Sequence, residues 1–345
     1  MKKYLLPREG KFYKANMHCH TDISDGKMTP EEVKAAYKEH GYSIVAYTDH
    51  EIMMPHTDLA DETFLPITAY EVQLRDWNRA TKCIKLYHMN LYSPEPDRYL
   101  SKTYCKKDAW WGNIVNHFTD EMAAAGLSER EYSKAFAQWI IDTAREEGML
   151  VSYNHPVWSL QNHEDYSGLK GLWGVEWYNT GCVRSGYVDS EQPIIDLLGE
   201  GERVFPLATD DNHSLSSAFG GWIMLKAKSL DYDTVFCALK KGDFYSSTGP
   251  EIKSLSIEDG IVTVKTSAAK RISLVTDRRL TVSKNADDKM LSGAELSLKS
   301  LIENHEKTKD YREAYFRIEV VDKYGNRALT RAYFFDELEG YLTLK

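Results

Sequence analysis

Short apolar runs alternate with segments of helical periodicity over the first 250 residues. Runs typical of buried strands lie at 44–47, 64–72, 84–92, 150–153, 174–178, 204–208 and 222–225. Between several of these runs the apolar spacing predicts helices over 128–147 and 231–241, and Thr29-Pro30 marks the start of another. Strands that alternate with helices predict an α/β unit with a mainly parallel sheet.

The pattern changes near residue 250. Short strand-like runs follow at 252–257, 261–266, 272–276, 315–322 and 328–335. Some are separated by turn sequences such as Glu258-Asp259-Gly260, which predicts a small all-β, sandwich-like unit of unassigned role. The turn at 247–250 marks a boundary, so we expect two domains, 1–249 and 250–345.

Residues 93–128 fit the alternation poorly. The segment is long, aromatic and polar, and it includes Trp110, Trp111 and His117. Such a stretch inside a compact domain is interpreted as an insertion or lid over a site, or equally as an ordinary connecting pair of helices.

Composition narrows the class of protein. The chain has 345 residues, 42% of them hydrophobic and 28% charged, which is typical of a globular protein. No apolar run approaches the length of a membrane span and the first residues do not resemble a secretory signal, so we expect no membrane association and a cytoplasmic location. Five widely spaced cysteines without a CxxC pair argue against a disulfide framework.

The net charge of −9 argues against binding to a nucleic-acid backbone as the main activity, because such proteins usually carry a basic surface. This net charge does not exclude a small phosphorylated substrate if metal ions supply local positive charge. The sequence predicts no oligomeric state.

The clearest chemical signal is the pair His18 and His20 near the end of a strand-like segment. Side chains alternate along a strand, so both imidazoles would lie on one face, where they could hold a transition metal. Asp25 follows in a turn that can bring its carboxylate to the same place. Alone, this pair could equally be a polar strand end in solvent.

Four further sites have the same character. Histidines and carboxylates occur within or just after apolar runs, at Thr48-Asp49-His50, Glu71, Asn154-His155-Pro156 and Asp210-Asp211-Asn212-His213. In α/β barrels the carboxyl ends of the strands are where sites are built. Burying this many ionisable groups without a cation would be costly, so the set predicts a metal centre.

Taken in order, these motifs resemble the PHP (polymerase and histidinol phosphatase) superfamily of metal-dependent phosphoesterases. The matching stretches are HCHTDISDG at 18–26, TDH at 48–50, Glu71 in ITAYEV, NHP at 154–156 and DDNH at 210–213. The resemblance covers roughly residues 12–250 and implies a distorted seven-stranded (β/α) barrel. It further implies a cluster of two or three divalent metals at the carboxyl ends of the strands.

The resemblance also implies a ligand arrangement. One metal would be held by His18, His20, Glu71 and Asp211; a second by Glu71, His88 and His155; a third by Asp25, His50 and His213. Zinc, manganese and iron all suit such mixed nitrogen and oxygen ligands. Asp210 is an alternative to Asp211, whose spacing to His213 matches the family better, and His117 is an alternative to His88.

The expected reaction is hydrolysis of a small phosphate ester of the nucleotide or sugar phosphate class. Clustered divalent ions would lower the pKa of a bridging water, and the hydroxide would attack phosphorus in line. Asp49 is expected to orient ligands from outside the metal shell. Arg184 is the predicted phosphate contact, with Arg75 and Arg79 as rivals, although each could be an ordinary surface arginine.

Two other functions stay open at this point. An amidohydrolase-like enzyme could use a similar histidine-rich site on a C–N bond, although such enzymes commonly carry a metal-bridging lysine and no lysine stands at a matching strand end. A non-catalytic, metal-stabilised scaffold with a ligand-binding β domain is the second, although a degenerate module would be expected to have lost ligands.

Overall fold

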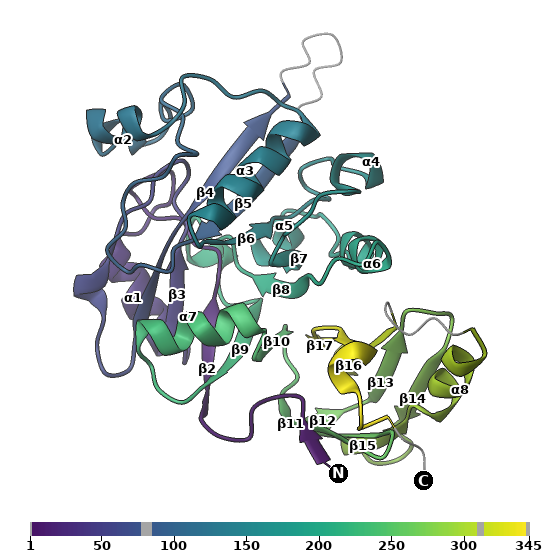
Figure 1. Ribbon diagram of the computed structural model, residues 1–345. Helices are drawn as coiled ribbons and strands as arrows, with labels where there is room; N and C mark the ends of the chain where they lie inside the picture. Colours follow the sequence, from purple (N-terminus) through teal and green to yellow (C-terminus); the bar gives the residue numbers. More distant parts are fainter. Residues whose placement is uncertain (1, 77–84, 309–313, 343–345) are drawn as a thin grey trace.

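The computed structural model describes residues 2–76, 85–308 and 314–342. It has a mixed α/β fold in which a large α/β part carries the strands β2–β10, and the strands β11–β18 lie beside it (Figure 1). Among the described residues, no helix combines the length and the apolar character that crossing a bilayer requires.

One large sheet runs through the α/β part. Its hydrogen-bonded order there is β10-β9-β2-β3-β4-β5-β6-β7-β8. The bounds of these strands are β2 Lys11–Asn16, β3 Ile44–Tyr47, β4 Leu65–Arg75, β5 Leu86–Tyr92, β6 Leu150–Tyr153, β7 Gly174–Asn179, β8 Phe205–Thr209, β9 Trp222–Ala227 and β10 Phe244–Ser247. Every residue of β3 and β6 is buried, which explains why these strands are near-continuous apolar runs in the sequence.

The strand β5 runs against its neighbours. It pairs antiparallel with both β4 and β6, whereas β2-β3-β4 and β6-β7-β8 are parallel. Its amino end therefore lies at the edge where the neighbouring strands have their carboxyl ends. This places His88, the third residue of β5, opposite Gln73 near the end of β4.

A closed barrel is not shown. Seven consecutive strands, β2–β8, follow one another in the sheet, but within the described residues no ladder of hydrogen bonds joins β8 back to β2. The loops after β2 and β8 are joined by an isolated bridge between Cys19 and Asn212. The amide of His20 donates to the carbonyl of Asn212 over 3.0 Å, and the amide of Asp211 donates to the carbonyl of His18 over 2.9 Å. The structure therefore supports a large mixed sheet, but it does not confirm the predicted seven-stranded barrel.

Helices fill the connections. Their bounds are α1 Pro30–Glu39, α2 Asp120–Ala125, α3 Lys134–Glu146, α4 His163–Tyr166, α5 Thr180–Arg184, α6 Gln192–Gly199, α7 Tyr232–Lys241 and α8 Lys299–Thr308, with short 3₁₀ turns η1 Thr57–Leu59, η2 Ile114–Asn116, η3 Leu215–Ser217 and η4 Phe335–Leu338. The predicted start of α1 is confirmed, because the Thr29 hydroxyl accepts from the amide of Glu32 and the Glu32 carboxylate accepts in return from the amide of Thr29. The helix α3 starts later than predicted, where Ser133 caps it.

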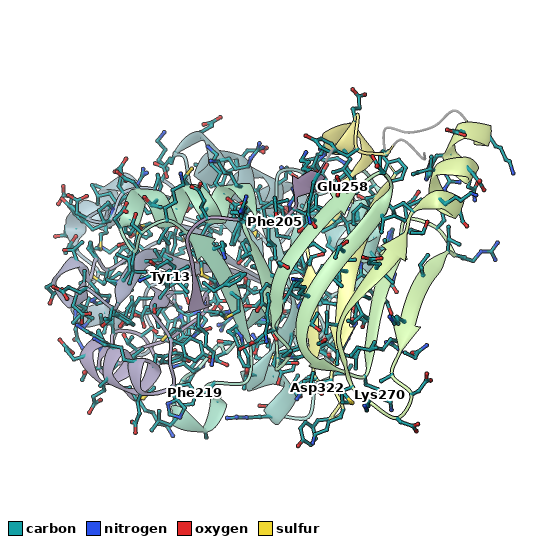
Figure 2. All side chains as sticks on the ribbon, turned by 90° about the horizontal axis from the view of Figure 1, so that it is seen from below. Tyr13, Phe205, Phe219, Glu258, Lys270 and Asp322 are labelled. Atoms are coloured by element: carbon teal, nitrogen blue, oxygen red, sulfur yellow. The ribbon has the colours of Figure 1, made fainter. Side chains whose placement is uncertain are left out.

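The C-terminal strands form two layers around a second apolar core. They are β11 Ile252–Glu258, β12 Ile261–Ala269, β13 Arg271–Thr276, β14 Thr281–Asn285, β15 Leu291–Ser297, β16 Tyr315–Val321, β17 Arg327–Thr330 and β18 Tyr333–Phe334. Figure 2 shows these strands from below, with Lys270 and Asp322 labelled beside each other at one end of the β13–β16 pair.

Two strand pairings tie this part to the rest of the chain. The N-terminal strand β1 (Lys2–Tyr4) pairs with β11, and β10 pairs with β17 through the register Ser246–Leu329. The large sheet therefore continues from the α/β part into the C-terminal strands. The helix α8 also lies here, so the part is not purely β, and its standing as a separate domain from residue 250 stays a prediction.

Candidate metal centre

His18 and His20 follow β2 and lie buried side by side. Their Nε2 atoms are 3.1 Å apart, while Cys19 between them faces the opposite side and packs among Met28, Val33 and Tyr37. The alternation that the sequence predicted for this segment is therefore present, and it turns both imidazoles toward the same point.

Glu71 on β4 lies at the centre of the site. Its carboxylate oxygens lie 3.1–3.5 Å from ring nitrogens of histidines that come from four different segments of the chain: His18, His20, His50, His88 and His155. Two ligands bound to one metal at 2.0–2.2 Å and at tetrahedral or octahedral angles are separated by roughly 2.9–3.5 Å. The spacing around Glu71 is therefore that of a ligand shell.

Asp211 and Asp25 complete the ring of donors. Asp211 Oδ1 lies 3.1 Å from His20 Nε2 and 3.3 Å from His18 Nε2. Asp25 Oδ2 lies 3.2 Å from His213 Nε2, and its other oxygen lies 3.9 Å from His20 Nδ1. The structure thus brings together every residue that the sequence assigned to the metals, including His88, which reaches the site because β5 is reversed.

Several of these buried atoms have no hydrogen-bond partner among the residues that the structure describes. They are His20 Nδ1, His50 Nδ1, Glu71 Oε2 and both ring nitrogens of His88. Buried polar atoms nearly always have a hydrogen-bond partner, so several unpaired polar atoms at one place indicate that a ligand binds there. Four sets of these donors could each hold a cation: His20, Asp25, His50 and His213; His18, His20 and Asp211; His50, Glu71 and His88; His18, His155 and Glu176.

The electrostatics of the cluster favour metal binding. Burial raises the pKa of Glu71, but the surrounding histidines, first His88 and then His18 and His50, outweigh this effect and hold the pKa well below its usual value. Burial together with His20 lowers the pKa of His50, which keeps that ring neutral. Ionised carboxylates and neutral imidazoles are the forms that bind divalent metals.

Other histidines of the cluster carry the positive charge that a metal would supply. Burial lowers the pKa of His18, but the carboxylates of Asp211, Glu71 and Glu176 reverse this and raise the pKa well above its ordinary value. In the same way Asp25 and Asp211 overcome the burial of His213 and raise its pKa to about 9. The carboxylates thus hold protons on the rings where a divalent cation could take their place.

Backbone geometry at two ligands is unusual. His155 has φ of +27° and Asp211 has φ of +51°, in the left-handed region that non-glycine residues rarely adopt. Each such residue costs on the order of 1–3 kcal/mol and persists where the surroundings fix it, which is most often at functional sites. Both residues direct their side chains into the cluster.

Asp49 and Asp210 have structural partners outside the cluster. Asp49 accepts hydrogen bonds from the amide and hydroxyl of Thr21 and from the Ser24 hydroxyl, and so holds the turn that leads to Asp25. Asp210 accepts from Tyr37, from Thr180 and from three successive backbone amides at 219–221. Asp211 rather than Asp210 therefore faces the histidines.

Two of the remaining candidates, Arg184 and His117, do not contribute to the cluster. Arg184, at the end of α5, donates to the carbonyl of Ser216 and does not line the pocket beside the cluster, so the expected phosphate contact gains no support. His117 caps η2 and takes part in none of the cluster's ion pairs among the described residues. Arg79 lies outside the described residues. Arg75 lines the pocket, with its Nη2 donating to Gln73 Oε1 over 2.8 Å.

Three supporting residues were not predicted. Glu176 on β7 accepts from His18 Nδ1 over 2.7 Å and also from the His155 amide, which orients both ligands. Asn154 Nδ2 donates to Glu71 Oε1 over 2.8 Å, and Asn179 Nδ2 donates to Asp211 Oδ2 over 3.1 Å. Two signals for them were present in the sequence: a glutamate inside the apolar run 174–178, and Asn154 within the motif Asn154-His155-Pro156.

A pocket of 270 Å³ opens beside the cluster. It is lined by ligand residues of the cluster and by five other side chains: Gln73, Arg75, Leu86, Trp111 and Trp158. Trp111 comes from the segment predicted as a lid, and its ring centre lies 4.4 Å from that of His50. The segment 93–128 therefore borders the site, while its motion as a lid stays a prediction.

Comparisons with known proteins give similar solved structures at low identity. No protein-family model and no curated protein matches the chain. A two-domain protein from Bacteroides vulgatus containing a predicted PHP-like metal-dependent phosphoesterase shares 12% identity with a TM-score of 0.45, covering 93% of this chain and 94% of its own. A putative metal-dependent phosphoesterase from Bifidobacterium adolescentis shares 16% identity with a TM-score of 0.41, covering 68% of this chain and 97% of its own.

A third structure, an amidohydrolase from Chromobacterium violaceum with bound sulfate, shares 14% identity with a TM-score of 0.37, covering 58% of this chain and 88% of its own. At these identities and TM-scores, the chemistry proposed below rests on the geometry of the site itself. Two of these three solved structures are named metal-dependent phosphoesterases, and the first of them is described as PHP-like.

Proposed function

We propose that the protein hydrolyses a small phosphate ester with two or three divalent metal ions, of which zinc, manganese and iron suit the ligands. The observation that carries this proposal is the shell of histidines around Glu71, together with the unpartnered buried nitrogens of His50 and His88. This donor set fits a cluster of borderline metals better than a hydrogen-bonded core.

We keep the ligand sets that the resemblance to PHP phosphoesterases implies: His18, His20, Glu71 and Asp211 would hold one metal; Glu71, His88 and His155 a second; Asp25, His50 and His213 a third. The groups of donors that lie close to one another agree with these sets in part, but they join His50 rather than His155 to Glu71 and His88. His50 Nδ1 also lies 3.1 Å from Glu71 Oε2, so Glu71 is suited to bridge more than one ion. The number and identity of the ions remain part of the proposal.

Divalent metals bound at such a site lower the pKa of water and neutralise the charge on a phosphate group. In the overall reaction the bond between phosphorus and the ester oxygen breaks, a bond to the water oxygen forms, and the leaving alcohol gains a proton. The reacting group would lie in the pocket that Glu71, Asp211 and His155 border, where bound metal ions would separate it from the two carboxylates. Glu176 fixes the ring of His18 and the backbone of His155 while this occurs.

Arg75 is the proposed phosphate contact in place of Arg184. It stands at the end of β4 on the same side as Glu71 and Gln73, because side chains two residues apart share a strand face. Its guanidinium is oriented by Gln73 and borders the pocket. In a chain of net charge −9, an arginine at the pocket would help to draw in an anion.

The alternatives have less support. No lysine is among the residues that line the described pocket, which disfavours an amidohydrolase-like centre with a bridging lysine. A non-catalytic scaffold would have no need of a full set of donors beside an open pocket. The pocket volume of 270 Å³ suits a small substrate rather than a polymer.

The test is phosphate release by purified protein. Metal content is measured by elemental analysis, and the protein is supplied with Mn²⁺ and a panel of monoesters and diesters. We expect turnover that His20→Ala abolishes while the circular dichroism spectrum is kept. Equal activity in the His20→Ala protein, or activity on amides alone, would contradict the proposal.

A further inference from the structure

Part of the pocket is lined by side chains that hydrolysis of a phosphate group does not by itself require. Beside the ligand residues of the cluster it presents two indoles and one leucine side chain, with a single amide and a single guanidinium. A phosphate would be held by the metals and by Arg75, so Leu86, Trp111 and Trp158 are available to the organic part of the substrate.

Trp158 stands on one side of the pocket. It follows the ligand His155 by three residues in the turn after β6, and its ring centre lies 5.0 Å from that of His155 and 5.8 Å from that of His88. Its side chain is half-buried. The indole therefore borders the proposed reaction centre directly.

Trp111 stands against a different ligand. Its ring centre lies 4.4 Å from that of His50, and the chain just after it is anchored to the metal-site turn. The Asn113 amide donates to the carbonyl of Ser24 over 2.9 Å, and Asn113 Nδ2 donates to the carbonyl of Asp22 over 2.8 Å. These bonds hold Trp111 in place before any substrate arrives, which lowers the entropy cost of binding.

We propose that Trp111 and Trp158 form a subsite for a flat ring, so that the substrate is a phosphate ester whose organic part carries an aromatic or heteroaromatic ring. This inference rests on the proposed hydrolase function. Rings bind well against indole faces, whereas the hydroxyls of a sugar would need more polar partners than Gln73 and Arg75 offer. A volume of 270 Å³ lies just below the usual range for ligand pockets, about 300–1,000 Å³, and leaves room for about one ring beside a phosphate.

The kinetic test compares two substrates in matched variants. Phenyl phosphate and glycerol 2-phosphate are assayed with Mn²⁺ and wild-type, Trp158→Ala, Trp111→Phe or Trp110→Ala protein. Trp110 precedes Trp111 but is 63% exposed, so it controls for disturbance of the segment. We expect Trp158→Ala to lower kcat/KM for phenyl phosphate roughly 10-fold more than for glycerol 2-phosphate, the size expected for loss of one ring stack.

The controls separate stacking from general damage. Trp111→Phe keeps a ring and should retain most of the preference for the aryl ester, and Trp110→Ala should keep all of it. Equal losses on both esters in Trp158→Ala would overturn the subsite. So would a substrate panel in which glucose 6-phosphate is preferred and its KM, rather than that of phenyl phosphate, depends on Trp158.

A binding experiment separates this inference from the hydrolase proposal. Phenylphosphonate and methylphosphonate, which are not hydrolysed, are titrated into the metal-loaded protein by calorimetry. If no ester is hydrolysed but phenylphosphonate binds more tightly than methylphosphonate, and Trp158→Ala removes the difference, the subsite stands and the hydrolase proposal falls. If esters are hydrolysed but the two phosphonates bind equally, the subsite falls alone.

Discussion

Asp210 and Asp211 are adjacent in the chain, yet their carboxylates contact separate sets of residues. Asp210 accepts from Tyr37, Thr180 and the amides of 219–221, whereas Asp211 faces His18 and His20. The positive φ of Asp211 accompanies this divergence. One residue therefore belongs to the scaffold and the other to the metal centre.

Removing each carboxylate should consequently have different effects. We expect Asp210→Ala to lower the free energy of unfolding by about 2–4 kcal/mol, because buried donors lose their acceptor. Asp211→Ala should lose bound metal and activity with a much smaller change in the unfolding of the metal-free protein. Urea denaturation and elemental analysis check both variants, and metal loss from a well-folded Asp210→Ala protein would reverse the assignment.

Glu176 should act on metal affinity through His18. Its carboxylate accepts from His18 Nδ1, so Glu176→Gln leaves the shape but weakens the orientation and basicity of the ring. We expect the affinity for the ion at His18 to fall about 10–100-fold, as is usual for such supporting carboxylates. Competition with a metal chelator measures it; an unchanged affinity would mean that Glu176 only fills space.

Metal binding should release protons and weaken in acid. The pKa of His213 is raised to about 9 by Asp25 and Asp211 despite burial, and that of His18 is raised too, so both rings are protonated in the metal-free protein at neutral pH. A metal needs the neutral ring, so affinity should rise between about pH 6 and 9. Calorimetry in buffers of different ionisation enthalpy counts the protons, and a count of zero would contradict this picture.

A buried ion pair joins Arg130, which follows the segment 93–128, to the strand end that carries His50. Arg130 Nη1 lies 2.6 Å from Glu51 Oε2 and 3.2 Å from the carbonyl of Gln73, and the Glu51 amide donates to the carbonyl of Glu71. Breaking a buried pair leaves an uncompensated charge, so Arg130→Met should cost about 3–5 kcal/mol of stability.

The matched control for that prediction is an exposed pair nearby. Lys107 pairs with Glu129 in solvent, so Lys107→Met should leave the denaturation midpoint unchanged. Equal effects of Lys107→Met and Arg130→Met would show that the buried pair has no special role.

Gly112 tests the contact between the Trp111 segment and the metal-site turn. It has φ of +60°, and a Cβ there would overlap the carbonyl oxygen of Ser24. We expect Gly112→Ala to displace the turn that carries Asp25 and to reduce the metal content. Gly41→Ala is the control, because Gly41 also has a positive φ, +77°, but open space around it; elemental analysis of both proteins separates backbone strain from the clash.

Strands buried on both faces were the most predictable elements. The bounds of β3 and β6 agree with the sequence prediction because both faces of these strands are covered and every residue is apolar or small. The strand β14 was missed because four of its five residues are exposed, so it has no apolar pattern. The reversal of β5 depends on which strands it pairs with, and local sequence does not encode that.

The sequence predicted the metal ligands of the candidate site better than the residues that orient those ligands. His18, His20 and Glu71 interrupt or end apolar runs, which makes them visible in the sequence. Glu176 supports His18 from a neighbouring strand, a relation that only the sheet order reveals. The sequence prediction named Arg184 as the phosphate contact and Arg75 only as a rival, but Arg75 is the one that borders the pocket.

The pairings of β1 with β11 and of β10 with β17 affect how the chain can be dissected. Cutting after Gly249 would strip an edge from each fragment, leaving backbone donors and acceptors open to association with other chains. Residues 1–249, which carry the histidine cluster, are therefore better studied within the whole polypeptide, with residues 250–345 still attached.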